Sequence, residues 1–215
     1  MSFWFSIRES RRFSIIAILL RYLLGYSFIP SGMKKILGER FTSIGTDSPV
    51  GFFFEGLYRS GYYWNFLGWG QVIAALLLLT QRLATIGNII FFFIIANICA
   101  ITFFMHFQGT WVITSLMLFA SCCLLLWDFH KLQFLFQKDN FTSKVVFENL
   151  PTYNRIWVIS GLVLFLISVL ESLITIPFIK STTQFIVFVV IAVLIVVATL
   201  FTASKRDNRM QINKA

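Results

Sequence analysis

Residues 84–105 read ATIGNIIFFFIIANICAITFFM, which is 22 consecutive residues without a charged side chain. A bilayer core about 30 Å thick is crossed by about 20 helical residues, so this segment is long enough to span a membrane. Other apolar stretches meet or approach this length, and the complete set is 13–30, 66–81, 84–105, 110–128, 155–176 and 184–204. The sequence therefore predicts an all-α, polytopic membrane protein with six spans.

The composition of the chain supports this class. Of its 215 residues, 58% are hydrophobic and 13% are charged, whereas soluble domains carry about 45–50% apolar and about 25% charged residues. These values exclude a soluble domain, and also a disordered chain, which needs the opposite composition. The formal net charge is +9. Membrane proteins collect Lys and Arg in cytoplasmic loops, and no basic run here carries interleaved base-stacking aromatics outside the spans, so we expect no nucleic-acid partner.

The connections between spans differ in length. The short turns at 81–83 and 106–109 make spans two to four antiparallel neighbours. The predicted organisation is a cytoplasmic or interfacial segment 1–12, a four-span bundle 13–128 with an outer loop 31–65, a cytoplasmic amphipathic connection 129–154, a two-span extension 155–204 and a basic cytoplasmic tail 205–215. With the N-terminus inside, twelve of the eighteen Lys and Arg lie on the cytoplasmic side and five outside, and Arg21 lies within the membrane. This asymmetry predicts that both termini are cytoplasmic.

Arg21 is the most unusual residue in the first span. At about 1.5 Å per residue it lies near mid-depth, where an arginine costs at least about 2.5–3.5 kcal/mol unless a partner, water or a ligand compensates it. We expect no acidic residue at matching depth in spans two to four, so Arg21 is a candidate ligand-binding residue. Gly25 and Gly32 share its helix face and permit close approach of another helix or of a bound group.

Polar side chains share inward faces of the other spans: Gln71 in the second, Asn97 in the third, and Thr114, Ser121 and Asp128 in the fourth. One interpretation is a polar seam in which Arg21, Gln71 and Asn97 line a site for a polar head group. The alternative is that these polar residues form ordinary interhelical hydrogen bonds. Thr114, Ser121 and Asp128 are predicted to have such a structural role, with Asp128 pairing with Lys131 at the cytoplasmic boundary.

Two further candidates belong to the outer loop. Glu55 and Arg59 are spaced i, i+4, which predicts a surface ion pair if the segment is helical. Alternatively, the aromatic segment around them dips into the outer leaflet and presents Glu55 to Arg21 or Lys34. Glu55 and Lys34 therefore join the candidate ligand-binding residues.

The sequence carries no pattern typical of a metal site, a phosphate-binding loop or a catalytic nucleophile. Its three cysteines, Cys99, Cys122 and Cys123, lie in apolar runs without a CxxC pair, which indicates packing rather than redox chemistry. We therefore expect no metal and assign no catalytic residue.

Residues 17–132 resemble the DoxX family of small bacterial membrane proteins. The resemblance rests on Arg21-x-x-x-Gly25, Phe28-Ile29-x-Ser31-Gly32 with Lys34, Glu55-Gly56-Leu57-Tyr58, Gly68-x-Gly70-Gln71, Arg82, Asn97-Ile98, Gly109-Thr110 and Trp127-Asp128. It implies a four-helix membrane bundle of the vitamin K epoxide reductase kind in the bacterial cytoplasmic (inner) membrane. Some members of the family are associated with thiosulfate:quinone oxidoreduction or membrane redox complexes. The lack of a CxxC pair argues against thiol chemistry here, and residues 155–204 exceed the minimal family unit.

Three functions are compatible with these observations. The predicted one is a non-catalytic accessory or scaffold subunit, surrounded by lipid and bound to a membrane-protein partner or to further copies of itself. The first alternative is a quinone- or lipid-binding redox component that resembles the thiosulfate:quinone oxidoreductase subunits. The second is a small-solute carrier, although no broken helix or inverted repeat is evident.

Overall fold

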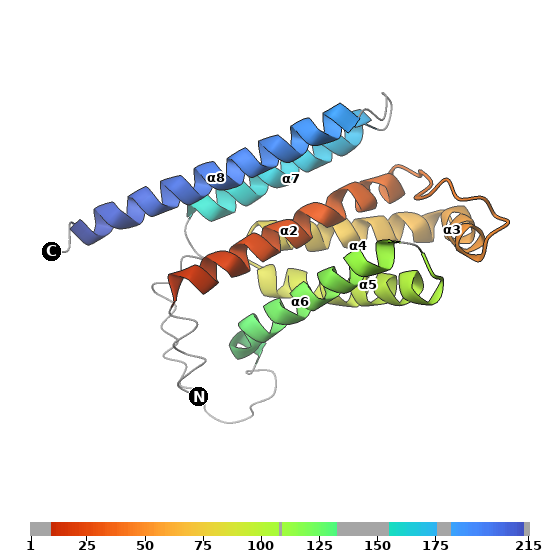
Figure 1. The fold of residues 1–215 in the computed structure, drawn as a ribbon, viewed down its shortest axis with the longest axis horizontal. Helices are drawn as coiled ribbons and strands as arrows, with labels where there is room; N and C mark the ends of the chain where they lie inside the picture. The colour runs from red at the N-terminus through yellow and green to blue at the C-terminus, as the bar shows by residue number, and fades with distance from the viewer. Residues whose placement is uncertain (1–9, 108, 133–154, 176–181, 213–215) are drawn as a thin grey trace.

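A computed structural model describes residues 10–107, 109–132, 155–175 and 182–212. In this part of the chain every regular element is a helix and none is a strand (Figure 1). The helices are α2 (Arg11–Ile36), α3 (Pro49–Arg59), α4 (Tyr62–Leu79), α5 (Ala84–Phe104), α6 (Thr110–Leu132), α7 (Arg155–Thr175) and α8 (Thr182–Ile212). The predicted all-α class is confirmed.

Among the described residues, five helices are long and apolar enough to cross a membrane. Their spans are Arg12–Ile36, Tyr62–Leu79, Ala84–Phe104, Thr110–Phe129 and Arg155–Ile174. The sixth predicted span, 184–204, lies within α8, whose described apolar section is the shorter Val189–Lys205. The chain is therefore a polytopic membrane protein.

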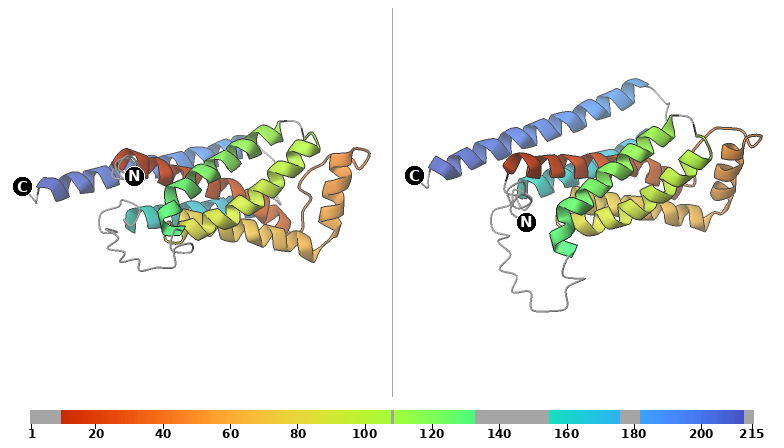
Figure 2. Two further views of the ribbon diagram at one scale, coloured as in Figure 1. Left: turned by 90° about the horizontal axis from the view of Figure 1, so that it is seen from below. Right: turned by 60° about the horizontal axis from the view of Figure 1, so that its bottom comes forward.

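Helix α2 lies at the centre of the bundle and packs against α4, α6 and α7. Helix α5 packs against both α4 and α6, as predicted for antiparallel neighbours. The α7–α8 pair runs along one side of the bundle (Figure 1), and the short helix α3 lies across the end of it (Figure 2). Because neighbouring helices alternate in direction, the start of α2 lies at the same end of the molecule as the turn between α4 and α5.

Glycines set the close packing of α2 on α4, as the sequence indicated. A Cβ at Gly25 would lie 3.2 Å from the backbone oxygen of Ala75, and one at Gly32 would lie 2.9 Å from the backbone oxygen of Gly68. The contact between Gly32 and Gly68 lies beyond Pro30, which is inside the helix. The predicted end of the first span near residue 30 was too early, since α2 continues past Pro30 to Ile36.

Helix α7 belongs to the core of the molecule. Trp157 is 1% exposed and Leu164 is 2% exposed, and both join the apolar core of the four-helix bundle. The Tyr22 hydroxyl donates to the backbone oxygen of Trp157, and Gly161 packs on the backbone of Leu79 with no room for a Cβ. Helix α7, the first span of the predicted two-span extension 155–204, is therefore packed into the four-helix bundle.

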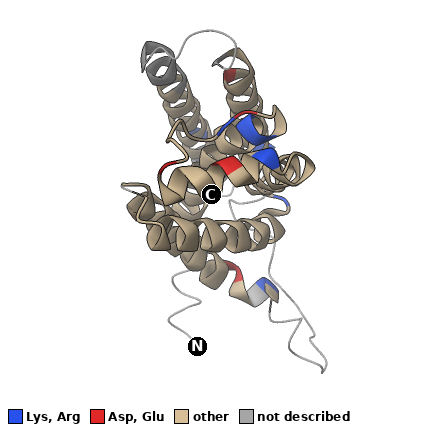
Figure 3. Cartoon of the chain, turned by 90° about the vertical axis from the view of Figure 1, so that its right-hand side faces the viewer, with Lys and Arg blue, Asp and Glu red and all other residues tan. Residues whose placement is uncertain are grey.

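The amphipathic connection predicted for 129–154 begins inside a helix, because α6 continues to Leu132. The rest of that connection lies outside the described residues, as do residues 1–9 of the predicted N-terminal segment and residues 213–215 of the tail. Seen from the α3 end, most of the helical ribbon belongs to residues other than Lys, Arg, Asp and Glu (Figure 3). Such a surface is suited to a hydrocarbon environment.

Candidate functional site

Arg21 is buried inside the bundle and has an acidic partner. Its side chain is 1% exposed. Nη2 donates to Asp128 Oδ2 at 2.8 Å, and Nη1 donates to Gln81 Oε1 at 3.0 Å. The expectation that no acid lies at matching depth was wrong.

The direction of helical side chains explains this contact. In a helix the Cα–Cβ bond points toward the N-terminus, so the long Arg21 side chain reaches back toward the start of α2. Asp128 lies near the end of α6 and Gln81 follows the end of α4, at that same end of the bundle. The guanidinium therefore reaches Asp128 and Gln81 near the ends of α6 and α4. The positions of the Cα atoms along the helices alone place these two residues too far from Arg21.

Asp128 has three hydrogen-bonding partners, which are Arg21, Lys131 and Thr85. Lys131 Nζ donates to Oδ1 at 2.9 Å, and the Thr85 hydroxyl donates to Oδ2 at 3.1 Å, the oxygen that Arg21 also contacts. The predicted Asp128–Lys131 contact is thus present. We call Arg21, Gln81, Thr85, Asp128 and Lys131 the Arg21 cluster. It holds two cations and one carboxylate, and Lys131, at 25% exposed, extends its charge outward.

Gln81 was not recognised from the sequence. It is 3% exposed and has a φ of 60°, a left-handed conformation that costs a non-glycine residue about 1–2 kcal/mol. Its side chain accepts from Arg21 and donates from Nε2 to the Leu78 backbone oxygen at 3.0 Å. These two hydrogen bonds offset the strain. Arg82, the next residue, is exposed.

Gln71 belongs to a second polar cluster. Lys35 Nζ donates to Gln71 Oε1 at 2.9 Å and to the Ser31 hydroxyl at 2.8 Å. The same ammonium lies 5.1 Å from the centre of the Trp64 ring, within the range of a cation–π contact. Lys35 is 7% exposed, whereas the predicted candidate Lys34 is only half-buried. The buried lysine here is therefore Lys35, which the sequence analysis did not select.

The two clusters are separate, so Arg21, Gln71 and Asn97 do not line one site. Gln71 and Gln81 are ten residues apart, which corresponds to about 15 Å along a helix. Asn97 lies on the exposed face of α5. The buried asparagine of α5 is Asn88, at 1% exposed, which was not selected from the sequence.

The polar face predicted on α6 is confirmed. Ser121 donates to Asn88 Oδ1 at 2.9 Å, and the hydroxyls of Thr114 and Thr102 are 2.9 Å apart. With Asp128, these residues repeat every seven positions along one side of α6 and each bonds to α5. They act as interhelical hydrogen-bonding residues, the structural alternative given above.

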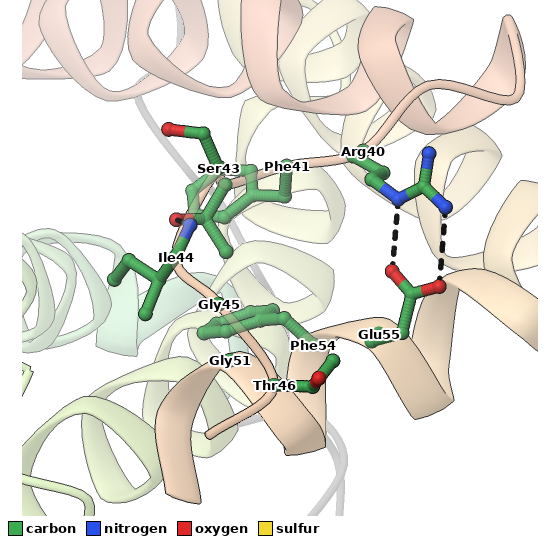
Figure 4. A pocket seen from close by; sticks show the side chains of 10 residues that line it. Arg40, Phe41, Ser43, Ile44, Gly45, Thr46, Gly51, Phe54 and Glu55 are labelled. Carbon is green, nitrogen blue, oxygen red and sulfur yellow. Dashed lines mark hydrogen bonds and ion pairs between the residues drawn. The ribbon is translucent and has the colours of Figure 1, made fainter. Parts of the chain in front are cut away.

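Glu55 forms ion pairs on the outer helix α3. This helix is capped at its N-terminus by Ser48, whose hydroxyl accepts from the Gly51 backbone nitrogen at 3.1 Å. Arg59 Nε lies 2.8 Å from Glu55 Oε1, which confirms the predicted i, i+4 pair. Arg40 binds the same carboxylate through Nε and Nη2 at 2.8 and 3.1 Å (Figure 4). Glu55 is thus paired with these two arginines rather than with Arg21 or Lys34.

The hydrogen bonds from Arg40 and then Arg59 lower the pKa of Glu55 from its ordinary 4.5 to about 2. Because the folded pKa is depressed, these ion pairs are complete above pH 4.5 and are lost as the pH falls toward 2. Beside them, the loop 40–46 and α3 enclose a pocket of about 280 Å³ (Figure 4). Phe41 and Phe54 line it, so it combines aromatic walls with a carboxylate already held by arginine.

The five long apolar helices and the buried polar clusters define a polytopic, all-helical membrane protein. The chain is 32% identical over 147 residues to the uncharacterized protein YwoB of Bacillus subtilis (strain 168), in an alignment that covers 65% of this chain and 94% of that relative. The chain therefore belongs to the same protein family as YwoB. No family model matches the chain, and no solved structure matches it significantly.

Proposed function

We propose that this protein is a non-catalytic accessory or scaffold subunit of a membrane complex. The observation that carries the proposal is the pairing of Arg21, the residue best suited to bind a ligand. Its two terminal nitrogens are taken by Asp128 and Gln81. A buried, internally paired arginine fixes the arrangement of helices α2, α4 and α6 and offers little to a quinone or solute.

The remaining polar residues of the bundle support the same proposal. Hydrogen bonds between helices occupy Asn88, Ser121, Thr102 and Thr114, and none of these residues lines the pocket between loop 40–46 and α3. A bundle of this kind supplies rigid packing surfaces. The four-helix arrangement of α2, α4, α5 and α6 also supports the proposed relation to the DoxX family.

The proposed location is the bacterial cytoplasmic membrane, with both termini in the cytoplasm. The relative from Bacillus subtilis supports a bacterial setting. Basic residues at the shared end of the helices support the orientation, because cytoplasmic ends collect Lys and Arg. The described ones at that end are Arg12, Arg82, Lys131, Arg155 and Lys205.

Helix α8 is the favoured docking surface for the partner protein. It packs on α7 and leaves large apolar side chains outward, among them Leu194 at 60% and Phe201 at 70% exposed. Lipid-exposed helices associate through van der Waals packing, which a bulkier side chain disturbs. Substitution of Leu194 therefore tests this surface.

The test is native mass spectrometry of the full-length protein, purified gently from its own membrane. We expect a stoichiometric protein partner, and we expect Leu194→Trp to reduce its recovery. Leu116→Trp, at an α6 residue that is 64% exposed, is the matched control and should retain the partner. A bare monomer, or a bound quinone without a protein partner, would contradict the scaffold function, and the quinone would favour the redox alternative.

A further inference from the structure

A groove lies between the α4–α5 turn and helix α7. Thr80, Arg82 and Leu83 line it from the turn, and Val158 and Leu162 line it from α7; its volume is about 600 Å³. This lies within the range of about 300–1,000 Å³ that is typical of small-ligand sites. Three of the five lining side chains are aliphatic, so most of the groove suits a hydrocarbon group.

The walls of the groove are fixed by buried contacts. Gly161 brings α7 against the backbone of Leu79, the last residue of α4. On the other wall, Gln81 holds the turn in its left-handed conformation through its bond to Arg21. The turn therefore presents its next residue, Arg82, outward beside α7. A site built on such fixed elements is preorganised for a ligand.

Two arginines flank the groove. Arg82 lines it directly, and Arg155 lies three residues before Val158 and seven before Leu162, so it shares their helix face one turn away. Both arginines are exposed, and neither forms an ion pair within the described part of the chain. Asp128, the carboxylate of the Arg21 cluster at this end of the bundle, is already bound to Arg21 and Lys131.

We propose that this groove binds an anionic glycerophospholipid. Its phosphate lies between the guanidinium groups of Arg82 and Arg155, and an acyl chain lies along Leu83, Val158 and Leu162. Arginine matches the geometry of phosphate oxygens, and basic pockets between membrane helices near the membrane surface bind anionic head groups. A zwitterionic lipid also carries a choline cation, which the two arginines repel. The site is independent of the proposed scaffold function.

The test compares two lipids on the full-length protein after removal of bound lipid in detergent. Native mass spectrometry counts bound phosphatidylglycerol and phosphatidylcholine at equal concentration. We expect phosphatidylglycerol to bind preferentially. Each basic side chain near an anionic surface contributes about a fivefold factor, so the double variant Arg82→Gln/Arg155→Gln should bind it about 25-fold more weakly.

The matched control is Lys205→Gln, which removes an exposed cation from α8 at the same end of the molecule and should keep the preference. Both arginines of the double variant are exposed, so its thermal unfolding in detergent should equal that of the unsubstituted protein. The proposal is overturned by equal binding of the two lipids, by a preference that survives the double variant, or by an equal loss in Lys205→Gln. Displacement of the lipid by an equal concentration of inorganic phosphate would also overturn it, since the acyl chain would then contribute nothing.

Discussion

At the scale of single residues, Asp128 supplies the one carboxylate of the Arg21 cluster. It is 2% exposed and contacts Arg21 and Lys131. The variant Asp128→Asn leaves the buried guanidinium without an anion, and breaking a buried pair in this way costs about 3–5 kcal/mol. We expect a loss of that size in the free energy of unfolding, measured by denaturant titration in mixed micelles.

Two further variants separate charge from packing. Replacing both partners, as Arg21→Met with Asp128→Leu, removes the uncompensated charge and should recover most of the lost stability. Asn97→Ala, on the exposed face of α5, should change stability by no more than about 0.5 kcal/mol. If Asp128→Asn has the same free energy of unfolding as the unsubstituted protein, the ion pair does not stabilise the bundle.

At the scale of helices, Gly161 controls how α7 docks on the bundle. A Cβ there would meet the backbone of Leu79, whereas one at Gly70 would meet only the end of the Ile94 side chain at 3.5 Å. Alanine favours a helix over glycine by about 0.5–1 kcal/mol. We therefore expect Gly161→Ala to lower the unfolding temperature in detergent and Gly70→Ala to leave it equal or higher. Equal responses of the two variants would mean that α7 is not tightly docked.

The helices and their shared faces could be predicted from the sequence, but the partners of the buried charges could not. Apolar length identifies the spans, and helical spacing identifies the polar face of α6 with Ser121 and Asp128. The contact of Arg21 depends instead on side-chain direction and on where α4 and α6 end. Likewise, spacing alone does not distinguish the buried Asn88 from the exposed Asn97, because both lie in the same uniformly apolar helix.

At the scale of the whole molecule, the buried cluster and the lipid groove lie at one end of the bundle, and α3 with its Arg40–Glu55 pair lies at the other (Figure 1). The first end gathers basic residues with few acids to balance them. Cytoplasmic ends collect Lys and Arg, so this end should face the cytoplasm. The groove would then open toward the leaflet whose anionic lipids attract such residues.

Thiol labelling in spheroplasts checks this orientation. In a chain with Cys99, Cys122 and Cys123 replaced by alanine, the variants Ser43→Cys and Lys205→Cys place one thiol at each end. We expect a membrane-impermeant maleimide to label Ser43→Cys in intact spheroplasts, and to label Lys205→Cys only after the membrane is opened. Because Lys205 is exposed and lies outside the lipid groove, neither burial nor bound lipid would explain its protection. The reverse pattern would place the basic end outside, and the asymmetry of Lys and Arg would then need a cause other than membrane insertion.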